Sequence, residues 1–182
     1  MDYIKTNIPD VTILEPKIFG DDRGYFMETY RKEDFDSHIN VTEFIQDNES
    51  KSSYGVLRGL HYQKGKWSQA KLVRVISGKV LDIAVDIRKS SPTFMQYVMV
   101  ELTDENKRQF FIPRGFAHGF LVLSKEAVFT YKVDNVYMPL AEASIRFDDP
   151  QLGIKWPIKK EKMLLSEKDN RALPLSEAEL FE

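Results

Sequence analysis

Short runs of β-branched residues, separated by turn residues, fill the middle of the chain and limit what it can fold into. Residues 71–88 read KLVRVISGKVLDIAVDIR, two strand-length runs with Ser77-Gly78 between them, a pattern that predicts a β-hairpin. Further runs of this kind lie at 97–102, 109–112, 119–123, 127–132 and 143–147. Because no helical pattern lies between the runs, a parallel sheet is disfavoured. We therefore predict an all-β fold, a cupin-like double-sheet jelly roll.

Helical patterns are confined to the edges of this strand-rich region. Residues 31–38 are rich in charge with Phe35 as an apolar anchor, and a second helical region starts at Ser166. The segment Ser176-Glu177-Ala178-Glu179 has the form of a capping box and predicts a short terminal helix. Because 182 residues suit one domain, we expect a single jelly-roll domain over 1–182 with short peripheral helices and a short C-terminal helical segment.

The charge and composition of the chain exclude several classes of partner. With 26 basic and 28 acidic residues the net charge is −2, which provides no long-range attraction to nucleic acid or to an anionic membrane. Cysteine is absent, so disulfides and thiolate metal sites are excluded. No run approaches the roughly 18 apolar residues of a membrane span, and the N-terminus lacks a signal-peptide pattern. We expect a cytoplasmic protein.

The three histidines of the chain differ in their surroundings. His38 ends the polar helical segment and is interpreted as a surface residue. His118 lies in PRGFAHG, which is similar to the second half of the cupin metal-binding pattern. The first half of that pattern needs a His-x-His pair, and the equivalent region here reads His61-Tyr62-Gln63. Because His61 and His118 alone cannot supply a three-nitrogen site, we predict chemistry without a metal or another cofactor.

Nine short motifs in a fixed order carry a resemblance to a known family. They are DRGYFME at 22–28, QDN at 46–48, GVLRGLHYQ at 55–63, KLVRV at 71–75, SPT at 91–93, IPRGFAHGF at 112–120, YK at 131–132, DDP at 148–150 and SEKD at 166–169. Each motif alone would be weak, but nine in order are highly specific. Over about residues 13–174 the chain resembles the dTDP-4-dehydrorhamnose 3,5-epimerases.

The resemblance implies an isomerase that inverts carbons 3 and 5 of dTDP-4-keto-6-deoxy-D-glucose, giving dTDP-4-dehydro-L-rhamnose for dTDP-L-rhamnose biosynthesis. It implies that His61 is the base and that Asp169 orients it, an arrangement that suits a base working near neutral pH. It also implies that Lys71 is the cation beside the carbon-4 oxygen, where enolate charge develops, and that Tyr131 is the acid on the opposite face of the ring. Without the resemblance, Asp169 is better interpreted as a helix cap, Tyr131 as a core aromatic and Lys71 as a solvated lysine.

The resemblance further implies a set of substrate-binding residues and a homodimer. The set comprises Arg23, Phe26, Glu28, Gln46, Asp47, Asn48, Arg58, His118, Tyr137, Glu142 and Lys168. Its arginines and lysine offer the donors that a diphosphate needs, and its aromatic residues offer surfaces for stacking. In the implied dimer, N-terminal strands carrying Arg23, Phe26 and Glu28 are exchanged and reach into the partner's site.

Some positions depart from the family pattern. Residues 64–70, KGKWSQA, replace a proline-rich turn, and Met95 and Ser144 stand where glycine is expected. Leu140 stands in place of glutamate and Phe147 in place of tryptophan. None of these residues is the proposed base, acid or cation, so the departures affect fine specificity and leave the reaction type unchanged.

Three alternatives remain open from the sequence. One is an epimerase that inverts only carbon 3 or carbon 5 of another dTDP-4-keto-6-deoxysugar. Another is a nucleotide-sugar-binding sandwich without catalysis, which would have no reason to keep His61, Lys71, Tyr131 and Asp169 together. A metal-dependent cupin is the third, and the missing His-x-His pair argues against it.

Overall fold

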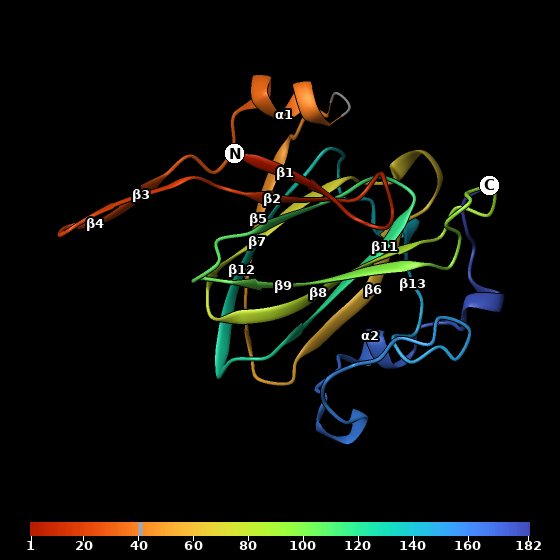
Figure 1. The fold of residues 1–182 in the computed structure, drawn as a ribbon. Helices are drawn as coiled ribbons and strands as arrows, with labels where there is room; N and C mark the ends of the chain where they lie inside the picture. Colours follow the sequence, from red (N-terminus) through yellow and green to blue (C-terminus); the bar gives the residue numbers. More distant parts are fainter. Residues whose placement is uncertain (40–41) are drawn as a thin grey trace.

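Two antiparallel sheets face one another in the computed structural model, in which residues 1–39 and 42–182 are described (Figure 1). The six-stranded sheet has the order β1 (Asp2–Lys5), β2 (Thr12–Glu15), β10 (Gln109–Ile112), β7 (Lys71–Ser77), β12 (Glu126–Val133) and β5 (Gln46–Ser53). The five-stranded sheet has the order β13 (Glu142–Ser144), β6 (Leu57–Gln63), β11 (Phe116–Val122), β8 (Lys79–Asp86) and β9 (Tyr97–Thr103). The predicted double-sheet jelly roll is confirmed.

The main core lies between the two sheets. Side chains alternate across each strand, so every second residue of the facing strands points into this layer. Val73 and Val75 of β7 share one buried cluster with Val80 of β8. Phe120 of β11 stacks on Phe129 of β12, with ring centroids 4.2 Å apart and planes 21° apart. Because β11 and β12 belong to different sheets, this stacked pair joins the two layers.

The predicted hairpin over 71–88 is wrong in its pairing, although both strands are present. Strand β7 pairs with β10 and β12, whereas β8 pairs with β9 and β11, so the chain passes from one sheet to the other between them. Gly78 forms this corner with φ +85°, and a Cβ there would lie 2.2 Å from the Glu126 carbonyl oxygen. A hairpin and a corner between sheets bury the same alternate residues, so the apolar pattern alone does not distinguish them.

Helices are short and peripheral. The predicted segment at 31–38 forms α1 (Lys32–His38), whose Phe35 is buried against Phe111 on the outer face of the six-stranded sheet. Helix α2 (Glu167–Asn170) begins at Ser166, whose hydroxyl accepts a hydrogen bond from the Asp169 backbone N–H at 3.1 Å. The remaining helical turns are η1 (Gly65–Trp67), η2 (Pro139–Ala141), η3 (Lys160–Lys162) and η4 (Leu175–Glu177).

The terminal helix predicted from Ser176 is wrong. Only the 3₁₀ turn η4 forms there, and the chain then continues beside residues 87–89. The Phe181 N–H donates to the Ile87 carbonyl at 3.2 Å, and the Lys89 N–H donates to the Phe181 carbonyl at 2.8 Å. The backbone of residues 87–89 supplies hydrogen-bond partners to this segment, whereas a short helix would first have to overcome the cost of nucleation.

A two-stranded ribbon of β3 (Ile18–Asp21) and β4 (Gly24–Met27) projects from the sheets near the N-terminus (Figure 1). Its aromatic side chains are unusually exposed, with 54% of Phe19, 58% of Tyr25 and 69% of Phe26 accessible. Near its tip, the Lys107 ammonium donates to the Tyr25 hydroxyl at 2.9 Å. An extended element with this much exposed apolar surface is typical of a contact with another protein surface.

The glycine expected at position 95 has a structural reason. Met95 adopts φ +67°, the left-handed conformation that glycine favours. A residue with a Cβ pays roughly 1–2 kcal/mol there. The Met95 side chain packs against the buried cluster on the outer face of β8, which includes Ile83 and Val85, and so offsets part of that strain.

Over the described residues, no helix is long and apolar enough to cross a membrane.

Candidate active site

Polar side chains meet on the inner faces of both sheets. On the five-stranded sheet, Asp82 lies between the core residues Val80 and Ala84, and His118 lies between Phe116 and Phe120. His61 of β6 stands opposite His118 in the register. The six-stranded sheet contributes Lys71, which shares the face of Val73 and Val75, and Tyr131, which packs against the same core cluster. Two facing sheets thus present a cluster of ionisable groups to one another.

His61 is joined to Asp169, 108 residues further along the chain. His61 Nε2 and Asp169 Oδ1 are 2.5 Å apart, and the Ser166 hydroxyl donates to Asp169 Oδ2 at 2.7 Å. Burial alone would raise the pKa of Asp169, but the hydrogen bonds from His61 and Ser166 outweigh burial and lower it. Because the carboxylate accepts at Nε2, a neutral His61 carries its proton there and keeps Nδ1 as its basic atom. Asp169 therefore contacts the N-cap residue Ser166 of α2 and partners His61 at once.

A bulge in β6 lets His61 lie close to β11. The register shifts between His118 and Phe120, where Gly59 lies against Gly119. Gly59 has φ +138°, and a Cβ there would lie 2.6 Å from the Gly119 Cα. The two backbones approach so closely that only glycine fits at this crossing, which explains the glycine before His61 in the sequence.

Lys71, Asp82 and His118 form a second buried group. His118 Nε2 lies 3.0 Å and 3.1 Å from the two carboxylate oxygens of Asp82. Burial lowers the pKa of Lys71 to about 8, although the nearby Asp82 and Glu142 charges act to raise it. Burial lowers the pKa of His118 well below its usual value, so its ring is neutral near pH 7. An ammonium held here would stabilise negative charge that develops on a bound molecule.

Asp82 was missed by the sequence reasoning. It is fully buried, whereas carboxylates are almost never fully buried without a partner. The signal was present in KVLDIAVD, where an aspartate takes an inward position between valine and alanine on a strand. A buried charge in an apolar strand indicates either a structural network or a functional site.

Tyr131 lies on the same sheet as Lys71 and faces the sheet that carries Asp82 and His118. Burial raises the pKa of its phenol, the Arg58 charge acts to lower it, and the Glu142 charge acts to raise it. Tyr131 therefore keeps its proton at neutral pH and can donate it. Arg58, on β6, is itself oriented by a hydrogen bond from its Nε to the Ser52 hydroxyl at 3.1 Å.

Glu142 links β13 to α2 beside His61. It forms an ion pair with Lys168 and accepts a hydrogen bond from the Tyr137 hydroxyl at 2.9 Å. Burial alone would raise the pKa of Glu142, but Lys168 and Tyr137 outweigh burial and lower it. Because Lys168 precedes Asp169, this ion pair also ties down the helix that carries the partner of His61. The structure brings Arg58, His118, Tyr137, Glu142 and Lys168 together with the four expected catalytic side chains.

The predicted QDN motif is divided between two faces of β5. Asn48 stands opposite Tyr131 and Gln46 opposite Val133, which places both on the inner face, and Gln46 Nε2 donates to Asn48 Oδ1 at 2.8 Å. Asp47 lies between them and points to the outer face, where it accepts from the Lys132 ammonium at 2.9 Å. Asp47 is therefore not brought to the site within this chain.

The three N-terminal residues of the predicted set lie on the ribbon or just after it. Arg23 stands at the turn between β3 and β4 and pairs with Asp21, and Phe26 is exposed on β4. Glu28 lies 3.7 Å from the Arg31 guanidinium. The ribbon that carries Arg23 and Phe26 projects from the sheets of its own chain (Figure 1).

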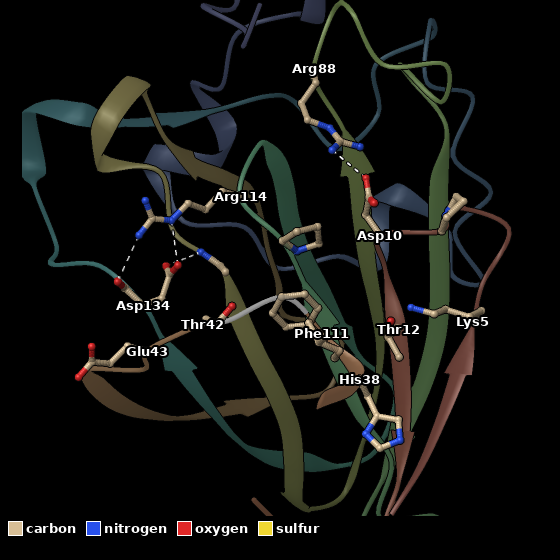
Figure 2. A pocket seen from close by; sticks show the side chains of 14 residues that line it. Lys5, Asp10, Thr12, His38, Thr42, Glu43, Arg88, Phe111, Arg114 and Asp134 are labelled. Carbon is tan, nitrogen blue, oxygen red and sulfur yellow. Dashed lines mark hydrogen bonds and ion pairs between the residues drawn. The ribbon is translucent and has the colours of Figure 1, made fainter. Parts of the chain in front are cut away.

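A separate hollow of about 660 Å³ lies beside α1 and shares no residue with this site (Figure 2). Its charged side chains are largely paired with one another, as Figure 2 shows for Arg88 with Asp10 and for Arg114 with Asp134. In the described part of the chain, no group of three or more histidine or carboxylate side chains is arranged to hold a metal ion.

Facing antiparallel sheets with an ionisable cluster between them define a jelly-roll protein of the cupin-like class. A family model described as dTDP-4-dehydrorhamnose 3,5-epimerase matches residues 5–177. The chain belongs to the dTDP-4-dehydrorhamnose 3,5-epimerase family.

Individual relatives agree in sequence and in structure. The dTDP-4-dehydrorhamnose 3,5-epimerase of Salmonella typhimurium is 54% identical over 183 residues, covering all of both chains. The crystal structure of a 3,5-epimerase from Legionella pneumophila, in complex with dTDP-4-keto-L-rhamnose, superposes with a TM-score of 0.96 at 49% identity, covering 100% of this chain and 97% of that one. A 3'-monoepimerase from Streptomyces bikiniensis, in complex with dTDP-quinovose, reaches 0.88 at 34% identity, covering 95% and 87%.

Proposed function

We propose that the chain is a 3,5-epimerase that converts dTDP-4-keto-6-deoxy-D-glucose to dTDP-4-dehydro-L-rhamnose in dTDP-L-rhamnose biosynthesis. One observation carries this proposal: His61 and Tyr131 lie on the inner faces of two different sheets. A sugar ring held between the sheets would meet a base on one face and an acid on the other. Removal of a proton from one face and return to the opposite face inverts the carbon.

The chemistry follows from the ketone at carbon 4, which acidifies the protons on carbons 3 and 5. His61 Nδ1 takes the proton from one of these carbons, and the electron pair of the broken C–H bond moves toward the ketone oxygen as an enolate forms. The Lys71 ammonium stabilises the charge on that oxygen. The Tyr131 hydroxyl then returns a proton to the carbon from the other side. Tyr131 regains a proton from solvent and His61 releases its proton to solvent, which restores both groups. Asp169 keeps His61 in the tautomer that leaves Nδ1 free.

The label pattern in deuterated water tests the reaction. The protein is incubated with dTDP-4-keto-6-deoxyglucose in D₂O, and deuterium at each carbon is followed by NMR. We expect label at both carbon 3 and carbon 5. Label at only one carbon would instead support the monoepimerase alternative, an activity that the Streptomyces bikiniensis neighbour carries by name. No label at either carbon would overturn the epimerase proposal for this substrate.

A homodimer with an exchanged ribbon forms a second part of the proposal. The exposed aromatics of β3 and β4 support it, and so does the projection of the ribbon, which carries Arg23 and Phe26, from the sheets of its own chain. In such a dimer these residues would complete the nucleotide site of the partner. Sedimentation equilibrium is expected to give twice the chain mass, and Phe26→Ser should shift the protein toward the monomer. A wild-type monomer at micromolar concentration would contradict the dimer.

Independence from metals and other cofactors stays a prediction, as does the cytoplasmic location. Metal analysis of the purified protein checks the first point. Stoichiometric iron, manganese or zinc, together with loss of activity on chelation, would contradict it.

A further inference from the structure

Asp82 is the one fully buried carboxylate among the described site residues that the mechanism above does not use. It lies in the middle of β8, between strands β9 and β11, and it has no exposed surface. Burial of a carboxylate costs several kcal/mol unless it is paired. Because burial of the Asp82 carboxylate is costly and the residue lies near the proposed cation, we expect the contacts that it makes to indicate its function.

The contacts of Asp82 point toward the site. Both carboxylate oxygens lie within hydrogen-bond distance of His118 Nε2, at 3.0 Å and 3.1 Å. Because the His118 ring is neutral, its Nε2–H donates to Asp82 and its Nδ1 is left as an acceptor. A ring held by both oxygens of one carboxylate has its orientation and its tautomer fixed.

Asp82 also acts on Lys71 across the space between the sheets. The charged and titratable groups around Lys71 and its neighbour His118 come from six elements. They are His61 on β6, Asp82 on β8, His118 on β11, Tyr131 on β12, Glu142 on β13 and Lys168 on α2. Among them, the Asp82 charge is the strongest one that favours the ammonium form; Glu142 favours it less, and Lys168 opposes it. Burial raises the pKa of Asp82 well above its usual value, and the Lys71 charge acts to lower it, so the charged forms of the two groups support each other. Glu142 is already engaged by Lys168 and Tyr137.

We propose that Asp82 is a positioning residue of the epimerase site, whose carboxylate fixes the ring of His118 and supplies the counter-charge that keeps Lys71 protonated opposite the substrate's carbon-4 oxygen. This inference rests on the proposed function, because it assigns Asp82 a task through Lys71. Burial alone would strip the proton from Lys71 as the pH approaches neutrality. Asp82 extends the pH range over which the cation is present.

The variant Asp82→Asn tests the proposal, because it keeps the shape and one acceptor oxygen for His118 and removes the charge. Turnover of dTDP-4-keto-6-deoxyglucose is measured from pH 5.5 to 9.5. The alkaline limb of the kcat profile should move about one pH unit toward acid. Because the Lys71 pKa then falls from about 8 to about 7, the protonated fraction, and kcat with it, should fall about threefold at pH 7.5 and about tenfold at pH 9. KM should change less than about threefold, since Asp82 has no surface for substrate.

Asp149→Asn is the matched control. Asp149 is also a buried aspartate, but it accepts from the backbone N–H groups of Gln151 and Leu175, away from the site. This variant should lower the melting temperature and leave the pH profile unmoved. If Asp82→Asn lost activity by the same factor at every pH, and the alkaline limb of its kcat profile did not move, the proposal would be overturned. Asp82 would then have a structural role only. A wild-type enzyme with no exchange would instead defeat the proposed function itself.

A measurement on the wild-type protein keeps the proposal testable if Asp82→Asn does not fold. A titration of the Lys71 Nζ by ¹⁵N NMR in the wild-type protein should show the ammonium charged at pH 7 and deprotonating near pH 8, in line with the pKa of about 8. A Lys71 that loses its proton below pH 6 would contradict the inference. Where both variants fold, Asp82→Asn should cause no further shift of the pH profile in a Lys71→Met background, since the effect passes through Lys71.

Discussion

Replacing His61 with asparagine is expected to abolish deuterium exchange at both carbon 3 and carbon 5. Asparagine keeps an amide that can donate to Asp169, but it lacks the basic Nδ1 atom. General base catalysis typically contributes about 10²–10⁴-fold, so exchange at each carbon should fall by about that factor. Binding of dTDP should survive within about threefold, because the donors expected to hold the diphosphate are other side chains. Exchange is followed by NMR in D₂O and binding by calorimetry.

His38→Asn is the control for this substitution. His38 lies at the exposed end of α1, stacked on Tyr3 with ring centroids 4.1 Å apart, and has no contact with the site. This variant should keep full exchange at both carbons. If His61→Asn retained more than about a tenth of normal exchange at either carbon, a second base would have to remove that proton, and the assignment of one base to both carbons would be wrong.

Tyr131→Phe should separate the two halves of the reaction. The phenyl ring keeps the packing against Phe129, whose centroid lies 6.1 Å away, so the core between the sheets should stay intact. Proton removal by His61 continues, and exchange should remain within about tenfold of normal. Return of a proton from the opposite face is lost, so formation of the inverted product should fall by about 10²-fold or more. Product is quantified by chromatography and label by NMR in the same samples.

Tyr62→Phe serves as the control for the loss of a phenol hydroxyl. Tyr62 is the neighbour of His61 on β6, but its hydroxyl donates to the Glu179 carbonyl at 2.8 Å, on the outer face of the sheet. Its removal should cost about 1 kcal/mol of stability and leave turnover unchanged. Normal product formation by Tyr131→Phe would show that another group returns the proton.

The strand-rich middle could be predicted from sequence because its inner faces are apolar and β-branched. The N-terminal strands and β5 lacked this signal. Strand β5 reads QDNESKSS, and its polar side chains face the site or solvent, so the usual alternation is absent. The corner at Gly78 was also invisible, since pairing partners are set by the whole fold and not by the local pattern. Helix α1 was predictable because its sequence is rich in charged residues and contains one apolar residue, Phe35, that can anchor it to the core.

The site shows a similar division. Local reasoning favoured a helix cap for Asp169, and the structure adds a bond to His61 that a separation of 108 residues conceals. The resemblance alone suggested this pair. Strand alternation could have divided Gln46 and Asn48 from Asp47 once β5 was recognised, because residues two apart share a face. Asp82 could have been identified from the sequence alone, without a resemblance to other proteins, because it is a carboxylate within an apolar strand.

The stacked rings of Phe120 and Phe129 acquire a meaning beyond core packing. Phe120 and Phe129 contact each other across the two sheets on which His61 and Tyr131 separately lie. Their contact helps to set the distance between the sheets, and with it the width available to a sugar ring. Protein interiors transmit small changes in volume as shifts of whole elements. Under the proposed function, the distance between the sheets therefore determines how a sugar ring lies between His61 and Tyr131.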